Sequence, residues 1–499
     1  MNTASQRPAG TAHLPPGVEP GSVDLLEDGS LPGRWTRRWR ERSSWPALQD
    51  VDGSWITSAE LEERSRSAAV RLRGIGLEPG DRFVLSAAPS AALVVAYVAA
   101  LRAGLVVVPL NTAYTQTEVG RIVRDAAPAG AAVDDAARAM WIREACGEAV
   151  AIVGVELDLP AAGERPIDLS ESDDPALLVY TSGTTGQPKG ALLSHGNLLS
   201  SATAVNLAWR WEPSDLLLLA LPLFHVHGLG VGINGSLCAG ASIAVRPKFD
   251  AADVAARCSD GVSLFFGVPT MYQRLASSGV AGALAPLRLL VSGSAPLPAA
   301  LAHAVADGAG QIPLERYGMT ETVMLTSNPY DGPRQPGTVG FALPGVDVRL
   351  ADSGEVEVRG PNVIAGYDQR PDADAEAFTA DGWFRTGDLG EFSENGYLHL
   401  VGRSKELIIT GGYNVHPREV EEVLGTHPDV REVAVVGRTS DAWGEEVTAV
   451  VVVERPVTVD ELRAHAARQL ASYKVPKTIE FAHELPRNAL GKILRGEFR

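Results

Sequence analysis

The sequence predicts an α/β fold built from parallel sheets with helices on both faces. Helix and strand signals alternate along the first half of the chain. The strands in this part are apolar throughout rather than at every second residue, as LVVVPL at 105–110 illustrates, which is typical of strands buried on both faces. At 499 residues the chain exceeds one ordinary domain several-fold, so two or more domains are expected.

The first clear helix opens at a capping box. Thr57 and Glu60 stand three positions apart and precede an apolar periodic stretch. GDRFVLSA at 80–87 then predicts a strand, and an Ala-rich helix precedes the LVVVPL strand. Residues 91–110 together are apolar enough to mimic a membrane span, but Arg102 and the Ala-Gly after it divide them into a helix and a strand. No membrane span is therefore expected.

The pattern changes twice further along the chain. From 339 to 400, short strands such as EVEVRG are separated by Gly, Pro and Asp turns, which predicts β-rich structure. After Gly402 a small α/β pattern begins, with a helix near 417–424 and another opened by a capping box at Thr458 and Glu461. The expected organisation is a disordered lead-in at 1–30, an N-terminal domain at 31–402 and a C-terminal domain at 403–499.

Charge and cysteine content limit the partners. Lys and Arg number 44 against 61 Asp and Glu, and a net charge of −17 repels a nucleic-acid backbone. Cys146, Cys238 and Cys258 lie far apart and form neither a disulfide framework nor a CxxC metal motif. The N-terminus lacks the apolar core of a signal peptide. We expect a cytoplasmic protein without a nucleic-acid partner, and its oligomeric state stays open.

The most informative motif is LLVYTSGTTGQPKG at 177–190, an apolar strand that runs into a loop of hydroxyls, glycines and one lysine. Glycine lets backbone N–H groups approach an anion, hydroxyls donate to the anion or hold its metal, and lysine neutralises it. The Walker loop is excluded, because Pro188, Lys189 and Gly190 stand where that loop requires Gly-Lys-Ser/Thr. The motif therefore predicts a phosphate-binding loop of another type.

Further motifs follow in order, and with them the chain resembles the adenylate-forming superfamily of acyl-CoA synthetases, peptide-synthetase adenylation domains and beetle luciferases. The resemblance runs from about residue 30 to the C-terminus. It implies a large N-terminal domain of two α/β subdomains and a distorted β-barrel, with a small mobile α/β C-terminal domain. The motifs are LPLFHVHGL at 221–229, GVPTMY at 267–272, SGSAPLP at 292–298, ERYGMTET at 315–322, GWFRTGDLG at 382–390, GRSKELIITGGYNVHPREVE from 402, and PRNALGK ending at Lys492.

The resemblance also implies a reaction. A carboxylate attacks the α-phosphate of ATP, pyrophosphate leaves, and the thiol of CoA then displaces AMP. The first step concentrates negative charge, so cations and N–H donors must already be in place. By the same resemblance Lys492 touches the α-phosphate, Glu321 holds Mg²⁺ with help from Thr184, and His225 completes the catalytic set. Asp388 accepts both ribose hydroxyls. The implied nucleotide-binding set is Thr181, Ser182, Gly183, Thr184, Thr185, Lys189, Gly293, Ser294, Ala295, Pro296, Tyr317, Gly318, Met319, Thr320, Asp388 and Arg403.

Domain motion is the next expectation. Lys492 ends the closing motif of the superfamily on the C-terminal domain, and a residue delivered by a mobile domain can also be withdrawn. Lys405 matches the superfamily's hinge. Rotation there would remove Lys492 and bring Gly411 and Gly412, which lack side chains, alongside a channel for the pantetheine arm of CoA.

Three features favour malonate or a small 2-substituted malonate as the acid. The pair His225 and His227 resembles enzymes for malonate and oxalate, and 318–340 resembles bacterial malonyl-CoA synthetases that tolerate methylmalonate. A second, buried carboxylate needs a partner, because burying it alone costs on the order of several kcal/mol. Arg274 is the expected guanidinium, with help from Ser294.

Each of these residues has a structural alternative. His227 could be a hydrogen-bonded core histidine, and Ser294 could simply support the adenine loop. Arg274 could end a helix and contact its carbonyl groups, and Arg288 beside SGSAPLP is a competing cation. The malonate assignment therefore depends mainly on the resemblance.

Other functions stay open. The same motifs would serve a synthetase for oxalate, a medium-chain acid or an aromatic acid. They would also serve an enzyme that loads a separate carrier protein instead of CoA. A relative that binds nucleotide without catalysis is the non-enzymatic alternative, and the presence of Glu321, Asp388 and Lys492 argues against it.

Overall fold

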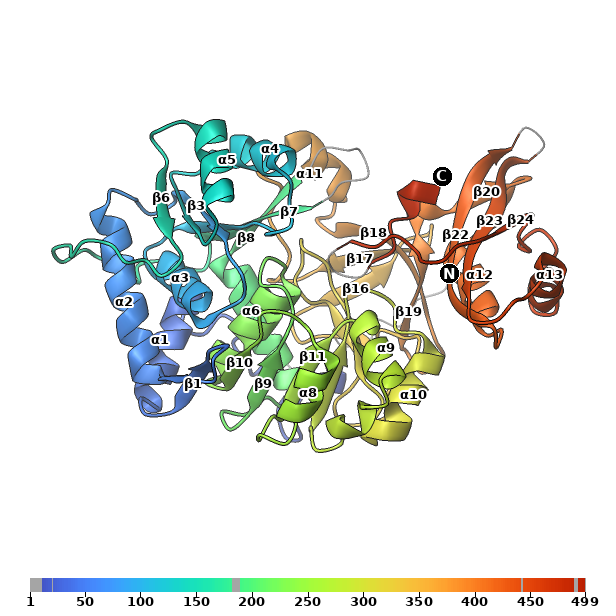
Figure 1. Ribbon diagram of the computed structural model, residues 1–499, viewed down its shortest axis with the longest axis horizontal. Helices are drawn as coiled ribbons and strands as arrows, with labels where there is room; N and C mark the ends of the chain where they lie inside the picture. The colour runs from blue at the N-terminus through green and yellow to red at the C-terminus, as the bar shows by residue number, and fades with distance from the viewer. Residues whose placement is uncertain (1–10, 20, 182–188, 441–442, 489–491, 499) are drawn as a thin grey trace.

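The structure is a computed structural model that describes residues 11–19, 21–181, 189–440, 443–488 and 492–498. Figure 1 shows a large body beside a smaller unit that is formed by the red C-terminal part of the chain. The large body contains two mainly parallel sheets and one antiparallel sheet, and the smaller unit contains a fourth sheet. The α/β architecture with a large N-terminal and a small C-terminal domain is confirmed.

The first sheet is covered by helices on both faces. Val84 packs into one core with α4 (Gln116–Ala126) and α5 (Ala136–Cys146). Phe83 and Leu85 pack into another with α2 (Ser58–Gly74) and α3 (Ala91–Arg102). This double burial explains why its strands are apolar throughout. The strand order is β6 (Ala151–Gly154), β5 (Gly130–Val133), β3 (Arg82–Ser86), β4 (Val106–Pro109), β7 (Pro175–Thr181) and β8 (Lys189–Ser194), with only β7 and β8 antiparallel.

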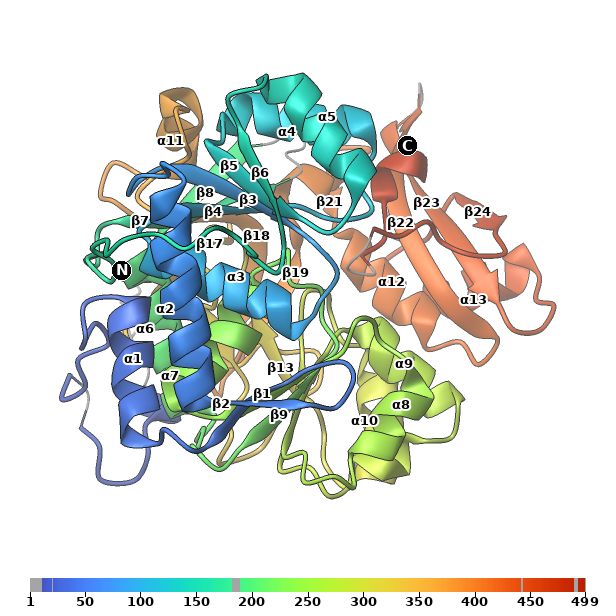
Figure 2. The same ribbon diagram turned by 60° about the vertical axis from the view of Figure 1, so that its left-hand side comes forward.

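The second sheet has nine strands and is also covered on both faces. One face packs against α1 (Leu31–Glu41), α6 (His195–Ala208) and α7 (Asn234–Ala239). The other packs against α8 (Ala251–Arg257), α9 (Pro269–Ser277) and α10 (Ala299–Ala309), which Figure 2 shows grouped below the small unit. The strand order is β15 (Phe341–Ala342), β14 (Thr326–Ser327), β13 (Leu314–Tyr317), β12 (Leu289–Ser292), β11 (Leu264–Gly267), β9 (Leu216–Leu219), β10 (Ser242–Val245), β1 (Pro46–Gln49) and β2 (Trp55–Thr57).

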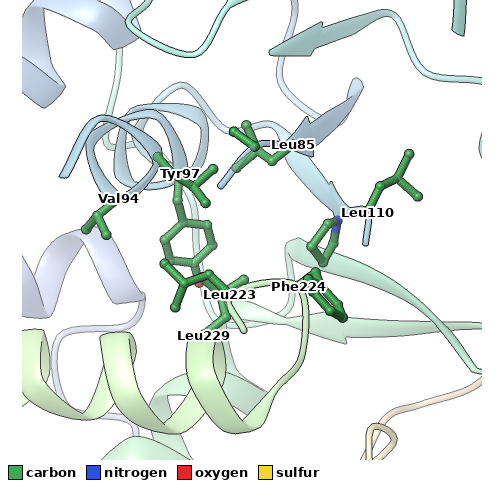
Figure 3. A pocket seen from close by; sticks show the side chains of 10 residues that line it. Leu85, Val94, Tyr97, Leu110, Leu223, Phe224 and Leu229 are labelled. Atoms are coloured by element: carbon green, nitrogen blue, oxygen red, sulfur yellow. The ribbon is translucent and has the colours of Figure 1, made fainter. Parts of the chain in front are cut away.

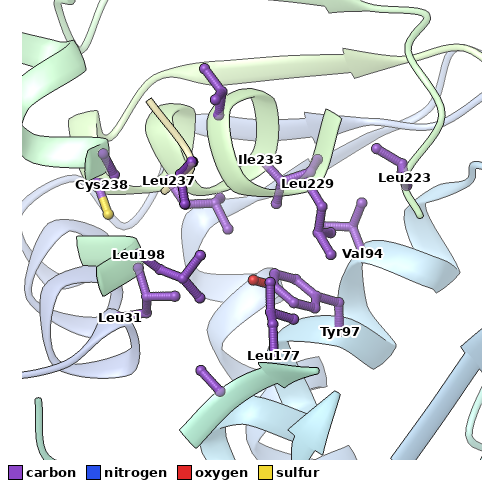
Figure 4. Close-up of a cluster of buried hydrophobic side chains, with 14 of the residues drawn as sticks. Leu31, Val94, Tyr97, Leu177, Leu198, Leu223, Leu229, Ile233, Leu237 and Cys238 are labelled. Atoms are coloured by element: carbon purple, nitrogen blue, oxygen red, sulfur yellow. The ribbon is translucent and has the colours of Figure 1, made fainter. Parts of the chain in front are cut away.

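One apolar core joins the two sheets. Figure 4 shows Leu31 of α1, Leu198 of α6, Tyr97 of α3 and Leu177 of β7 within it. The Tyr97 hydroxyl donates to Asn234 Oδ1 at 3.0 Å, so the polar atom of this fully buried ring has a partner. The helices between the sheets therefore pack both sheets into one continuous core.

The β-rich segment forms the third sheet, which is antiparallel. Isolated bridges join Gly340 to Leu398 and Ala191 to Tyr367, and so connect this segment to both larger sheets. The short helix α11 (Pro371–Ala377) precedes its third strand. The strand order is β16 (Asp347–Leu350), β17 (Glu355–Arg359), β18 (Phe384–Phe392) and β19 (Leu398–Arg403).

The small unit has its own sheet and its own core. Two helices, α12 (Pro417–Gly425) and α13 (Val459–Ala467), pack on that sheet. Its strand order is β21 (Tyr413–Val415), β20 (Ile408–Thr410), β23 (Gly444–Val453) and β22 (Val430–Ser440), with β24 (Thr478–Phe481) parallel to β23. The short helical segments among the described residues are η1 (Thr11–His13), η2 (His227–Ile233), η3 (Ala281–Leu284), η4 (Ser404–Glu406) and η5 (Arg495–Phe498), of which η2 is a π-helix.

Several local predictions are confirmed. Reciprocal capping boxes form at Thr57 and at Thr458. The apolar stretch 91–110 divides into α3 and β4 as expected. In the described part of the chain, no helix combines the length and hydropathy that a membrane span requires.

Part of the lead-in at 1–30, which was expected to be disordered, is ordered in the structure. Residues 1–10 lie outside the described part of the chain, but His13 is 1% exposed, and Arg210 donates to the carbonyl oxygens of His13 and Leu14. His13 Nε2 also lies 3.2 Å from the Phe341 carbonyl oxygen. These contacts come from segments some two hundred and three hundred residues away, which local composition cannot reveal.

Arg288, the competing cation of the sequence analysis, has a structural role. Its Nε donates to Asp215 Oδ1 at 2.7 Å, its second terminal nitrogen contacts Oδ2, and Nη1 donates to the Trp209 carbonyl oxygen. Asp215 is 3% exposed and also accepts from Ser263. The pair links β9 to β12 and leaves Arg288 unavailable to a substrate.

Asp215→Ala tests this role. The change removes the buried partner of a guanidinium, so we expect the free energy of unfolding to fall by about 3 kcal/mol. Urea unfolding followed by tryptophan fluorescence measures it, because Trp209 is in contact with Arg288. Asp307→Ala, at an exposed position of α10, is the control. An unfolding midpoint that Asp215→Ala leaves unchanged would contradict the assignment.

Candidate active site

A buried carboxylate lies where the two domains meet. Asp388 on β18 is 6% exposed. Tyr317, at the end of β13, donates its hydroxyl to Asp388 Oδ2 at 2.6 Å, and Arg403 donates Nε to Oδ1 at 2.8 Å. A carboxylate has about four acceptor positions, so Asp388 can accept further hydrogen bonds from a ligand. The structure thus brings Tyr317, Asp388 and Arg403 together, although the first and the last of them are 86 positions apart in the sequence.

Glu321 and Lys189 lie on either side of one tyrosine. Tyr367 donates its hydroxyl to Glu321 Oε1 at 2.9 Å, and Lys189 Nζ lies 5.4 Å from the centroid of the Tyr367 ring. Thr181, at the end of β7, donates to the Lys189 carbonyl oxygen at 3.4 Å. Lys189 also approaches Glu376 at 3.9 Å, but that carboxylate is 78% exposed and contributes little. Ser182, Gly183, Thr184 and Thr185 lie outside the described residues.

Sequence reasoning missed Tyr367. It lies within VIAGYD at 363–368, in the β-rich part of the sequence, and carries no motif signal of its own. The structure places it in the isolated bridge to Ala191, directly beside the strand that begins at Lys189. Only the tertiary structure brings it between Lys189 and Glu321.

Glu321 fits one ligand of a Mg²⁺ ion. Its side chain is 6% exposed, and burial raises its pKa although Tyr367 and Arg403 oppose that effect. A cation at this carboxylate would favour its charged form. Within the described ranges, no cluster of three or more His, Cys, Asp or Glu residues could form a complete metal site. The donor set therefore suits Mg²⁺ bound by one carboxylate and by substrate phosphates, which is the usual arrangement for this ion.

The two histidines lie at the other end of the site. His227 begins the π-helix η2, and its Nδ1 lies 3.1 Å from Ser294 Oγ, while Nε2 has no partner among the described atoms. Burial lowers the pKa of His225 to about 4 and that of His227 well below its usual value, so both rings are neutral at pH 7. Phe224, beside His225, lines a small apolar pocket with Leu110 and Leu223 (Figure 3).

A buried arginine faces the same histidine. Arg316, on β13, is 6% exposed, and its positive charge contributes to the low pKa of His227. Its Nε and one terminal nitrogen have no hydrogen-bond partner among the described atoms, and burial lowers its pKa to about 9. A Cβ atom at Gly293 would lie only 2.3 Å from Arg316 Nε, which explains the glycine in SGSAPLP. Ser294 next to it has a φ of 68°, a conformation that L residues rarely adopt.

Arg274 does not have the buried environment that its expected role requires. Its side chain is exposed on α9, and the guanidinium carbon lies 4.9 Å from the centroid of the Phe249 ring. Arg316 lies inside the motif ERYGMTET, but the motif does not by itself indicate a residue of the acid pocket. A charged residue in a strand that is otherwise buried was the signal for it.

Lys492 lies close to the carboxylate end of the site. Burial lowers its pKa, the Arg403 charge lowers it further, and the charges of Glu406 and Asp388 oppose this. Lys492 N donates to Asn488 Oδ1 at 3.0 Å, and Asn488 N donates to the Lys492 carbonyl oxygen at 2.9 Å. Two hydrogen bonds thus join the asparagine of PRNALGK to its lysine.

The other predicted residues lie in the following elements. Gly411 and Gly412 form the exposed turn between β20 and β21, with φ values of 56° and 81°. The Gly411 N–H donates to the Trp443 carbonyl oxygen at 2.8 Å. Lys405 lies in η4, the short segment that directly follows β19. Gly293, Ala295 and Pro296 adjoin β12, and Gly318, Met319 and Thr320 follow β13.

Comparison with known proteins agrees with this geometry. Residues 35–368 match the family model described as AMP-binding enzyme, and residues 419–492 match the AMP-binding enzyme C-terminal domain. A feruloyl-CoA synthase from an Amycolatopsis species is 37% identical, with 94% of this chain and 98% of that protein covered. A malonate–CoA ligase from Arabidopsis thaliana is 34% identical, with 86% of this chain and 79% of that protein covered.

A solved structure extends the likeness to three dimensions. ATP-bound MatB from Rhodopseudomonas palustris is 38% identical and has a TM-score of 0.89, with 94% of this chain and 98% of that chain covered. The resemblance inferred from the motifs is therefore confirmed across both domains. Since the large and small parts match their own models in the expected order, this chain belongs to the family of AMP-binding enzymes.

Proposed function

We propose that this protein is an AMP-forming acyl-CoA synthetase that activates malonate or a small 2-substituted malonate with ATP and Mg²⁺ and transfers the acyl group to CoA. The observation that carries the choice of acid is the buried Arg316 near His227 and Ser294, two of whose guanidinium nitrogens lack a hydrogen-bond partner among the described atoms. A malonate–CoA ligase and MatB are among the similar proteins, as is a feruloyl-CoA synthase. A monocarboxylate such as ferulate would leave a buried guanidinium unpaired.

In the first step an oxygen of the acid attacks the α-phosphorus of ATP, and the bond to pyrophosphate breaks with its electron pair on the leaving group. Lys492 and Lys189 supply positive charge at the α-phosphate and at the leaving pyrophosphate. Mg²⁺, held by Glu321, supplies further positive charge to the phosphates when bound. Asp388 orients the ribose by accepting its hydroxyls, and Tyr317 lies against the adenine.

In the second step the CoA thiolate attacks the acyl carbon and AMP leaves. We propose that the small domain, residues 403–499, rotates about Lys405 between the steps and replaces Lys492 with the turn at Gly411 and Gly412. The N-terminal domain would then comprise 31–402. In the described arrangement Lys492 lies near Asp388 and Arg403 while the glycine turn is exposed, which suits the first step.

We propose that Arg316, rather than Arg274, binds the second carboxylate. A planar guanidinium can make two parallel hydrogen bonds to a carboxylate, and those bonds are strong in a site that excludes water. The neutral His227 and the Ser294 hydroxyl can complete the pocket. Arg274, whose side chain is exposed, stays the alternative partner for the second carboxylate.

The acceptor and the compartment are also proposals. CoA is favoured by the CoA ligases among the relatives, and a separate acyl-carrier protein is the alternative thiol. The described cysteines Cys146, Cys238 and Cys258 are all free, which favours a cytoplasmic location.

The acid assignment is tested by pyrophosphate release with malonate, methylmalonate, butyrate and ferulate. We expect wild type to prefer malonate or methylmalonate. Arg316→Met should reduce malonate activation about 100- to 1,000-fold, because the buried second carboxylate loses its partner, and should change butyrate activation little. Arg274→Met is the matched variant and should keep most malonate activity.

The two variants separate the possible results. Selective loss of malonate in Arg274→Met alone would move the assignment to Arg274. Wild-type preference for ferulate would refute the dicarboxylate proposal and leave the acyl-CoA synthetase class in place. Equal loss of all acids in Arg316→Met would indicate a structural role for this arginine.

Lys492→Ala tests the division of roles between the steps. It should reduce ATP–pyrophosphate exchange at least 100-fold, because positive charge at the α-phosphate is lost, while thioester formation from supplied acyl-adenylate should stay within about twofold. Lys474→Ala, which removes a lysine paired with Glu419 in the same domain, is the control. A comparable loss in both half-reactions would contradict domain rotation.

Tyr367→Phe tests the proposed metal ligand. The tyrosine hydroxyl lowers the pKa of Glu321, so its removal should raise that pKa further. Glu321 would then be protonated up to a higher pH, and the acid limb of pyrophosphate release at limiting Mg²⁺ should move to higher pH. We expect saturating Mg²⁺ to restore most of the rate. Tyr114→Phe, elsewhere in the large domain, should leave the profile unchanged, and an unchanged profile in Tyr367→Phe would argue against Glu321 as the ligand.

A further inference from the structure

One arginine of helix α12 in the small domain donates a hydrogen bond to the large domain. Arg418 has a side chain that is only 13% exposed, and its terminal nitrogen donates to the Gly337 carbonyl oxygen at 3.4 Å. Its Nε donates to Glu422 on the same helix at 2.8 Å. The Glu422 side chain is 63% exposed, so that pair alone does not account for the burial of Arg418.

A buried carboxylate lies behind this contact. Glu315, on β13, is 3% exposed, and its Oε1 accepts from the Leu297 N–H at 2.9 Å. Its Oε2 has no hydrogen-bond partner among the described atoms. Glu315 therefore ties the SGSAPLP loop to β13, one residue before Arg316.

The small domain supplies the positive charge that faces this carboxylate. The charged groups that face Glu315 are Arg418 and Glu422, both on α12, and the N–H groups of Leu297 and Gly337 also point to it. Burial raises the pKa of Glu315 to about 7, Arg418 and the two N–H groups lower it, and Glu422 raises it. Without α12 nearby, Glu315 would be a buried acid with no cation.

The same helix holds the segment that carries Lys492. Arg495, three residues beyond Lys492, donates to both oxygens of Glu421 on α12 at 2.7 and 2.8 Å and to Glu406 in η4 at 3.1 Å. These side chains are at most 24% exposed. Because Arg495 fixes the C-terminal segment to α12, the position of α12 on the large domain sets the position of Lys492.

We propose that Arg418 is a positioning residue for the first half-reaction: its hydrogen bond to the Gly337 carbonyl oxygen, near the buried Glu315, holds the small domain where Lys492 reaches the site. The same contact steadies the SGSAPLP loop while the acid and adenine are bound. When the small domain rotates, Arg418 leaves with Glu422 as its partner, and the loop loses the charge that faces Glu315. This inference rests on the proposed two-step function.

The test measures both half-reactions for Arg418→Ala, Arg418→Lys and Arg455→Ala. Arg455, with a side chain 71% exposed in an ion pair with Asp429 of the same domain, is the matched control. We expect Arg418→Ala to slow ATP–pyrophosphate exchange about tenfold, the effect of one lost charged hydrogen bond, and to leave thioester formation from supplied acyl-adenylate unchanged or faster. Arg418→Lys should restore part of the exchange, and Arg455→Ala should behave as wild type.

A pH profile separates positioning from a general loss of stability. Removing the Arg418 charge should raise the pKa of Glu315, so the acid limb of the exchange rate should move to higher pH in Arg418→Ala. Glu315→Gln should abolish this shift, and the double variant should be no slower than the slower single variant. Additive losses in the double variant would overturn the proposal.

Two further results would also overturn it: equal slowing of both half-reactions in Arg418→Ala, or a defect of the same size in Arg455→Ala. The exchange assay uses whichever acid wild type activates fastest. An error in the malonate assignment therefore changes the acid used and not the comparison between variants. Intact circular dichroism and unfolding midpoints would show that the variants are folded.

Discussion

The arrangement of the site depends on one buried carboxylate. Asp388 is 6% exposed, and its oxygens accept from Tyr317 of the nine-stranded sheet and from Arg403 at the end of β19. A buried charge of this kind is stable only when it is paired and hydrogen-bonded, so the two partners are held where the domains meet. The charges of Asp388 and Arg403 also affect the pKa of Lys492 in the small domain.

Three consecutive side chains of strand β13 have three different surroundings. Successive residues of a strand point to opposite faces, so Glu315 and Tyr317 share one side and Arg316 takes the other. Glu315 holds the SGSAPLP loop and faces α12, Tyr317 donates to Asp388, and Arg316 lies against Gly293 and His227. A shift of one residue in the register of this strand would exchange these environments. The pairing of Arg316 with Ser327 and of Val291 with Leu314 keeps the register in place.

Overall similarity does not identify the acid. A feruloyl-CoA synthase and a malonate–CoA ligase match this chain at 37% and 34% identity, although one acid carries a bulky ring and the other a second charge. In the function proposed above, selection of the acid depends on a few side chains around His227, Ser294 and Arg316, where one buried guanidinium would favour a dicarboxylate over a neutral tail.

The sequence by itself determined the features that depend on neighbouring residues: the two capping boxes, the division of 91–110 into helix and strand, the α/β class, and the family through its ordered motifs. Only the tertiary structure decided which charges are buried together. It placed Arg288 against Asp215, left Arg274 exposed, buried Arg316 beside His227, and set Tyr367 between Lys189 and Glu321. These outcomes depend on burial and on contacts between segments far apart in the chain. Motif spacing carries no information about either, because a guanidinium has the same local sequence whether it meets water or a buried carboxylate.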